Sequence, residues 1–247
     1  MGNEDGVARE TEWSVQPPHP VRHAGIEHDV WNPAECDVSI RPGWFWHKAE
    51  DSKVKSLDHL LDIYYKSVGR NSALLLNVPP NDQGLFSEPD VERLREFRAV
   101  LDESFKTNLV AGKNVKASSS RGKTFNALKC VDENPNSFWT TDDDVTSGWI
   151  EIDLEKQTNF NVSKVEEMIS LGQRIESYRI DIWDGSNWQN IVKGTTIGHK
   201  KLDRFEPVTT NKLRLVIKKS RACPTIREIG LYFVPNTGGG ATVFHKS

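Results

Sequence analysis

The chain has 247 residues, of which 36% are hydrophobic and 27% charged, and its formal net charge is −3. This length and balance are typical of one large or two medium globular domains. Acidic and basic residues are mixed along the chain without a basic stripe able to neutralise several phosphates, which argues against nucleic-acid binding. No apolar stretch has the length needed to span a bilayer, which argues against a membrane protein.

The first elements alternate between strand and helix. Residues 36–41 alternate like a short strand that Pro42 and Gly43 end. The apolar spacing predicts a helix over residues 57–68, with Ser56 as its N-cap. We therefore expect a strand followed closely by an amphipathic helix.

A second strand and helix follow. Residues 73–78 form a nearly unbroken apolar run, which is typical of a strand buried on both faces. Ser87 and Asp90 have the spacing of a capping box that opens a second helix. Strand, helix, strand, helix is an α/β order, and residues 1–107 are predicted to be one domain.

From residue 108 the pattern changes to short alternating segments separated by turns. They cover residues 149–154, 178–183, 212–218 and 226–234. Every second residue in them is apolar, as a half-buried strand requires, so residues 108–236 are predicted to form an antiparallel β-sandwich. Residues 237–247, which include three consecutive glycines, are predicted to be a disordered tail.

Three cysteines and one sequon add little to the assignment. Cys130 and Cys223 either pair or stay as two buried free thiols, and the odd count gives no disulfide framework. Asn161 begins the chain's N-V-S sequon and is a candidate glycosylation site. The N-terminus has no apolar signal-peptide core.

Two blocks in the first domain carry a resemblance to a known family. The first runs N-P-A-E-C-D-V-S-I-R-P-G-W-F-W-H from Asn32 to His47, and the second runs from Ser67 to Leu85. Together they resemble family 29 glycoside hydrolases, the α-L-fucosidases, and look closest to the plant-type enzymes. The second half, with D-E-N-P-N-S-F-W from Asp132, resembles discoidin-like jelly-roll modules. The resemblance implies an α/β plus all-β chain, the last strands and helices of a (β/α)8 barrel followed by a discoidin-like jelly roll.

The family resemblance also implies a reaction and its residues. Such enzymes are retaining hydrolases that release α-1,3- or α-1,4-linked L-fucose through a nucleophile and an acid/base. The motif places the acid/base at Glu35, presented by a loop before the strand, with Asp37 as its rival. It places sugar contacts at Arg41, Trp44 and Trp46; for Arg41 a surface salt bridge is the alternative. The resemblance also implies that catalysis requires no cofactor.

The expected nucleophile motif is absent from the first 31 residues, where Asp5 and Asp29 stand in other contexts. We therefore expect this chain alone not to hydrolyse fucosides. The alternative is a non-catalytic carbohydrate-binding sandwich with a degenerate barrel remnant. Family analogy predicts fucosylated oligosaccharides or N-glycans as partners and secretion to the apoplast.

The jelly-roll resemblance implies a structural calcium ion as well. The positions that match best are Asp132, Ser137 and Glu228. Carboxylate and hydroxyl oxygens are ligands that this hard cation prefers.

Overall fold

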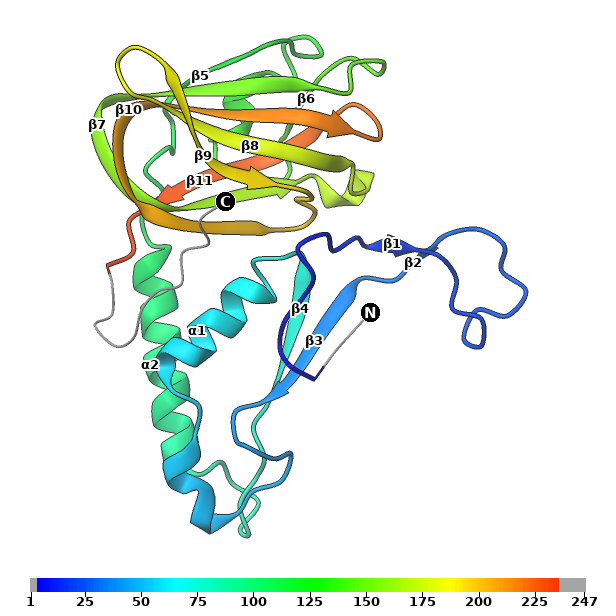
Figure 1. Ribbon diagram of the computed structural model, residues 1–247, viewed down its shortest axis with the longest axis vertical. Coiled ribbons are helices and arrows are strands. Elements are labelled where there is room, and N and C mark those ends of the chain that lie inside the picture. Colours follow the sequence, from blue (N-terminus) through cyan, green and yellow to red (C-terminus); the bar gives the residue numbers. More distant parts are fainter. Residues whose placement is uncertain (1–3, 236–247) are drawn as a thin grey trace.

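The chain forms an α/β segment joined to a β-sandwich, as the computed structural model of residues 4–235 shows (Figure 1). The predicted tail, residues 237–247, lies outside the described residues. Among the described residues, no helix is long and apolar enough to cross a membrane.

The α/β segment is built on two parallel strands, β3 (Ala34–Ser39) and β4 (Ser72–Asn77), paired from end to end. Helix α1 (Leu57–Lys66) connects them, and α2 (Glu88–Ser104) follows β4. Both helices pack on one face of the strand pair through an apolar cluster. Its members are Val38, Ile40, Leu60 and Ile63, with Leu74, Leu76, Val78, Leu94 and Phe97 against them. The predicted α/β order is therefore observed.

Helix α1 begins as predicted. The Ser56 hydroxyl accepts a hydrogen bond from the backbone N–H of His59 at 3.3 Å, which satisfies one of the free donors of the first turn. The helix ends at Lys66, two residues earlier than predicted, and the Gly69 N–H bonds back to the Tyr64 carbonyl at 3.0 Å.

The predictions for the capping of α2 and for the burial of β4 are wrong. Ser87 precedes α2, but no side-chain capping bond forms, because Ser87 bonds Asp51 and the Asp90 carboxylate turns to Arg41. Strand β4 is not buried on both faces, since Leu75 is 52% exposed. The helices cover only one face of the strand pair, so the face that carries Leu75 stays open.

Short elements complete the first half. Strands β1 (Val15–Gln16) and β2 (Val30–Trp31) pair antiparallel at the base of a long loop that extends away from the body (Figure 1). The 3-10 helix η1 (Lys48–Lys53) lies between β3 and α1.

The sandwich is a seven-stranded sheet folded into two layers. Its remaining elements are β5 (Asn114–Ala117), η2 (Ala127–Cys130), β6 (Trp139–Thr140), β7 (Gly148–Glu167), η3 (Ile169–Leu171), β8 (Ile175–Trp183), β9 (Trp188–Gly194), β10 (Lys201–Ser220) and β11 (Thr225–Tyr232). The strand order is β6-β11-β7-β10-β8-β9, with β5 also paired to β7.

Strands β7 and β10 have 20 residues each and take part in both layers. Their pairing register shifts between Arg204 and Val208 and again between Thr210 and Lys212, so the ladder bends there. Pro207 lies at the first shift, where a residue without an N–H is tolerated. The predicted strands 149–154, 178–183 and 212–218 fall within β7, β8 and β10, whereas the predicted strand 226–234 extends two residues beyond the end of β11. The sequence pattern did not predict the long continuations of β7 and β10.

The sandwich core is closed and apolar. Trp139 is fully buried and its indole N–H donates to the Ser119 carbonyl at 2.9 Å. Cys130 and Cys223 are both buried free thiols, so of the two alternatives for these cysteines the disulfide is not formed.

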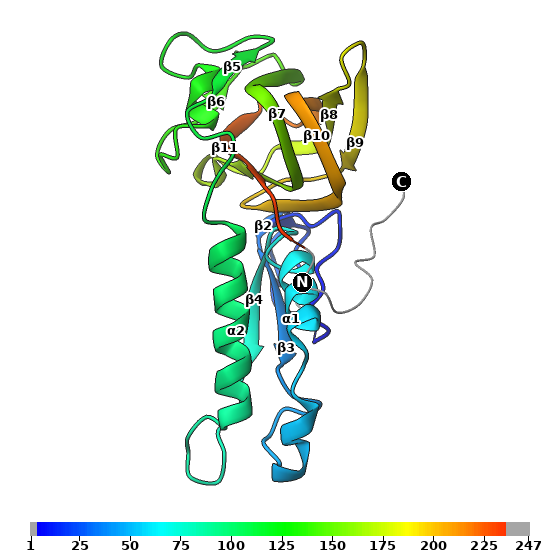
Figure 2. The ribbon, with the colours of Figure 1, turned by 90° about the vertical axis from the view of Figure 1, so that its left-hand side faces the viewer.

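A polar seam fixes the sandwich on the α/β segment. Asn71 lies just before β4 with φ +61°, and its side chain accepts from the His199 N–H at 2.7 Å while donating to Ser14 and Gln173. Apolar contacts among Tyr65, Val162, Leu202 and Tyr232 lie beside it. Figure 2 shows α2 rising to the sandwich next to this contact. The two parts are therefore held together at several points besides the chain connection.

Candidate functional site

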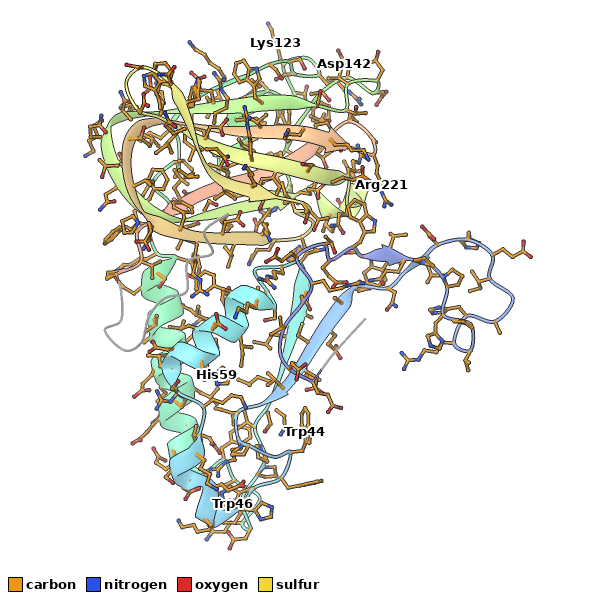
Figure 3. All side chains as sticks on the ribbon, in the orientation of Figure 1. Trp44, Trp46, His59, Lys123, Asp142 and Arg221 are labelled. Carbon is orange, nitrogen blue, oxygen red and sulfur yellow. The ribbon has the colours of Figure 1, made fainter. Side chains whose placement is uncertain are left out.

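An aromatic loop follows the C-terminal end of β3. Trp44 is 38% exposed and Phe45 is 78% exposed, whereas Trp46 is half-buried. Figure 3 places Trp44 and Trp46 at the end of the α/β segment that lies farthest from the sandwich. These rings are placed where the C-terminal ends of two parallel strands meet, the edge where α/β barrels carry their active sites.

Asn77 positions this loop. As the last residue of β4, it donates through Nδ2 to the Ser39 hydroxyl and to the Trp44 carbonyl, both at 3.1 Å. One side chain thus links the ends of β3 and β4 to the aromatic loop. Its role is structural, because these hydrogen bonds bind protein groups rather than a free ligand.

Arg41 does not reach this surface. Its side chain is 0% exposed, its Nε lies 2.9 Å from Asp90 and its Nη2 lies 2.9 Å from Asp51. The expected sugar contact is therefore wrong for Arg41, and so is the alternative of a surface salt bridge. The guanidinium instead ties the loop after β3 to the start of α2.

The partners of Arg41 were missed by sequence reasoning. Asp90 has the spacing of a capping residue, and nothing near Arg41 in the sequence points to a residue 49 positions away. Lys55 was missed too. Its ammonium group donates to the carbonyls of Ser39 at 2.6 Å and of Arg41 at 3.2 Å, which satisfies acceptors at the end of β3 and just beyond it.

Glu35 lies within β3 and not in a loop before it, so that part of the prediction is wrong. It is exposed on the open face of the strand pair, and Asp37 shares this face two residues on. Their backbone positions are about 6.6 Å apart along the strand.

Glu35 and the aromatic loop lie at opposite ends of β3. Ser39 lies four positions after Glu35, about 13 Å along a strand, and Trp44 lies beyond Ser39. The structure therefore does not bring the predicted acid/base together with the predicted sugar contacts. The acid/base role of Glu35 stays a prediction from the resemblance, without support from this geometry.

The predicted calcium residues lie at one edge of the sandwich. Asp132 accepts from the Ser137 hydroxyl at 2.7 and 2.8 Å and from the Asn134 N–H at 3.1 Å. Glu228 is 3% exposed, and its Oε1 accepts from Asn108 at 3.1 Å. Its Oε2 is buried without a hydrogen-bond partner, and burial raises the pKa of Glu228 to about 7. This orphaned oxygen is what a bound cation would satisfy.

Asn161 is not available for glycosylation in the folded chain. It is 6% exposed, and its amide donates to the Val234 carbonyl and accepts from the Val234 N–H, each at 2.8 Å. The sequon prediction is therefore wrong in this fold, because the amide nitrogen that a glycan would occupy is buried and already bonded.

Two family models match the chain. Residues 17–103 match the family described as alpha-L-fucosidase, and residues 114–229 match the F5/8 type C domain. Together with the fold, these matches define a class of protein: a glycosidase segment followed by a discoidin-like sandwich.

Relatives and solved structures agree with that class. The chain is 39% identical over 249 residues to alpha-L-fucosidase 1 of Arabidopsis thaliana, covering 94% of this chain and 49% of that protein. It is 35% identical to a GH29 fucosidase of Ruminococcus gnavus solved in complex with fucose, with a TM-score of 0.87, covering 96% of this chain and 50% of the other. A glycoside hydrolase 29 family member from an unknown rumen bacterium is 32% identical, with a TM-score of 0.74, over 98% of this chain and 41% of the other.

The chain carries a segment of an α-L-fucosidase domain as its first part and an F5/8 type C domain as its second part. It spans about half the length of the curated relatives it matches.

Proposed function

We propose that this chain is the part of a retaining α-L-fucosidase that contributes the last strands of the catalytic barrel and the attached sandwich. The observation that carries this proposal is the likeness of both parts, in one arrangement, to a fucosidase solved with fucose bound. The substrates we infer are α-1,3- or α-1,4-fucosylated oligosaccharides or N-glycans, and the location we infer by family analogy is the apoplast.

The geometry of the α/β segment supports a section of a barrel. Its two strands are parallel, one face carries both helices, and the other face is open. In a (β/α)8 barrel the helices cover the outside and the strands face one another across the interior. On this proposal Glu35, Asp37 and Leu75 face the barrel interior, and strands from outside this chain cover them.

A retaining glycosidase uses two carboxyl groups with different roles. One carboxylate attacks the anomeric carbon, and a carboxylic acid first protonates the leaving oxygen and then activates water. In this proposal the chain contributes the aromatic loop, whose Trp44 ring lines the fucose site, while the nucleophile comes from a segment outside this chain.

The role of Glu35 is decided by one substitution in a complete barrel. A fusion in which this chain replaces the matching half of the Arabidopsis relative provides that barrel. If Glu35 is the acid/base, Glu35→Gln lowers kcat on a chromogenic α-L-fucoside by about 100-fold or more. Asp37→Asn is the matched control. A Glu35→Gln fusion with a rate within threefold of its parent removes Glu35 from the chemistry.

We also propose a structural calcium ion held by Asp132, Ser137 and Glu228. Within residues 4–235 no group of three or more acidic, histidine or cysteine side chains is placed to hold a metal, so backbone carbonyls would have to complete the shell. The buried, unpartnered Oε2 of Glu228 supports the proposal, because an ion would compensate the burial that raises its pKa.

Calcium is expected to raise the Tm of the sandwich. A ligand at 100 times its Kd stabilises the folded state by about 2.7 kcal/mol, and EGTA should reverse the shift. Glu228→Gln should abolish the calcium response while the sandwich stays folded. Magnesium, which demands a smaller octahedral shell, serves as the matched ion control. An identical Tm with calcium and with EGTA contradicts the site.

A further inference from the structure

The aromatic loop after β3 is anchored at both of its ends. At the start, the Lys55 ammonium group donates to the carbonyls of Ser39 and Arg41. At the end, the Arg41 guanidinium donates to the His47 carbonyl at 3.4 Å. Residues 42–46, which carry the exposed aromatic rings, lie between these anchors. The position of the rings therefore depends on what holds the middle of the loop.

A single hydrogen bond holds the middle of this loop. Within the part of the chain that the structure describes, the bond from Asn77 Nδ2 to the Trp44 carbonyl, 3.1 Å long, is the only hydrogen bond that joins residues 42–46 to another segment. No atom lies within 4 Å of a Cβ added at Gly43, so open space adjoins the loop there. The backbone of the loop is therefore tethered at one point, and that point is the residue that carries the Trp44 ring.

The chemistry and place of Asn77 suit this task. A carbonyl can only accept, so the amide nitrogen of Asn77 must face Trp44, and its second proton goes to the Ser39 hydroxyl at 3.1 Å. The backbone of Asn77 is held separately, because its carbonyl accepts from the Ile40 N–H at 2.9 Å and it pairs with Ser39 in the β3–β4 register. A substitution at Asn77 therefore removes the side-chain bonds and leaves the strand pairing in place.

We propose that Asn77 is a positioning residue for fucoside hydrolysis, which holds the Trp44 backbone so that the indole ring lies on the fucose site. This inference rests on the proposed function, in which the Trp44 ring lines that site. Asn77 acts through Trp44 rather than on the sugar itself. A displacement of about 1 Å in a positioning group can lower a rate by about 100-fold, so the loss of a single tether is measurable.

The first test is kinetic and uses the fusion of this chain with the unmatched half of the Arabidopsis relative. Asn77→Ala should lower kcat on a chromogenic α-L-fucoside by about tenfold or more. The loss should appear in kcat rather than in KM, because a displaced ring still contacts fucose but no longer holds it in the reacting geometry. Asn77→Ser, with a shorter side chain, covers a failure of the alanine variant to fold.

Asn81→Ala is the matched control for the kinetic test. Asn81 also follows β4, and its side chain accepts from the N–H groups of Gln83 and Leu85, both at 3.0 Å. The same chemical change there removes two hydrogen bonds without releasing the Trp44 carbonyl. Its kcat should stay within about threefold of that of the parent fusion.

A double-mutant cycle separates positioning from a general loss of structure. In the fusion that carries Trp44→Ala, adding Asn77→Ala should lower kcat by less than about twofold, because the ring that Asn77 positions is already absent. A merely structural role of Asn77 predicts instead that the two losses multiply.

The second test follows the loop in the isolated chain, without turnover. Asn77→Ala should shift the NMR signal of the Trp44 indole N–H and speed amide exchange in residues 43–46, while the Tm stays unchanged. An unmoved Trp44 signal, or an active fusion that is indifferent to Asn77→Ala or shows multiplying losses, would overturn this inference alone. A folded parent fusion without activity contradicts the proposed function itself, and this inference falls with it.

Discussion

Replacing Asp90 by alanine is expected to destabilise the α/β segment by about 3–5 kcal/mol, because it leaves a buried arginine without its main partner. Arg41 and Asp90 are each 0% exposed, and Asp90 accepts from the guanidinium Nε through both carboxylate oxygens. Asp51 remains as a second partner of Arg41 but is 22% exposed. It cannot replace a fully desolvated carboxylate.

The loss of unfolding free energy is measured by urea unfolding, with the hydrogen exchange of the α2 amides as the readout. Asp102→Ala is the matched control on the same helix, since Asp102 pairs with Arg98 but is 56% exposed, and it should cost less than about 1 kcal/mol. The double variant Arg41→Met, Asp90→Leu should recover much of the loss, because no charge is left buried. A loss below 1 kcal/mol for Asp90→Ala contradicts the buried link.

Alanine at Gly198 is expected to loosen the seam between the two parts, at a cost of about 2–5 kcal/mol. Gly198 has φ +70°, a conformation that costs an L-residue roughly 1–2 kcal/mol. An added Cβ would lie 2.3 Å from the Asn71 side chain, so overpacking adds roughly 1–3 kcal/mol. The expected result is a lower unfolding free energy and faster proteolysis between the α/β segment and the sandwich.

The variant Gly112→Ala separates the cost of the backbone conformation from the cost of the contact with Asn71. The φ of Gly112 is +66° and no atom lies within 4 Å of an added Cβ, so Gly112→Ala carries the backbone cost alone. We expect Gly198→Ala to exceed it by at least about 1 kcal/mol. Equal losses for the two variants would mean that the contact with Asn71 does not hold the seam.

The sequence predicts local features of this fold better than distant ones. Ser56 caps α1 as its position suggests, and alternation locates a strand within each of β7, β8, β10 and β11. These features depend on neighbouring residues. The continuation of β10 through Pro207 was not predicted, because proline argues against a strand unless a register shift accommodates it.

Candidate site residues were harder to place, because their partners lie far away in the sequence. Arg41 and Asp90 each have a plausible local role, and only the folded chain shows that they pair over 49 positions. Asn161 has a sequon, but its burial against Val234 depends on the end of the sandwich. Trp44 is the predicted contact that the fold leaves exposed at the C-terminal ends of parallel strands.

For the contacts of Arg214 with Trp149 and Trp188, the sequence predicted the strands but not how they come together. Alternation predicted a half-buried strand over residues 149–154 and another over 212–218, and the structure adds the pairing that brings Trp149 to Arg214. The reach of Arg214 across β8 to Trp188 depends on the strand order β10-β8-β9, which the sequence pattern does not determine.

The measurement that tests the central proposal most directly is fucose release from a chromogenic α-L-fucoside, by the purified chain and by its fusion with the unmatched half of the Arabidopsis relative. The account predicts no turnover by the chain, although it unfolds cooperatively, and turnover by the fusion that falls when Trp44 is replaced by alanine. Turnover by the chain alone, or a folded fusion without activity, would contradict it.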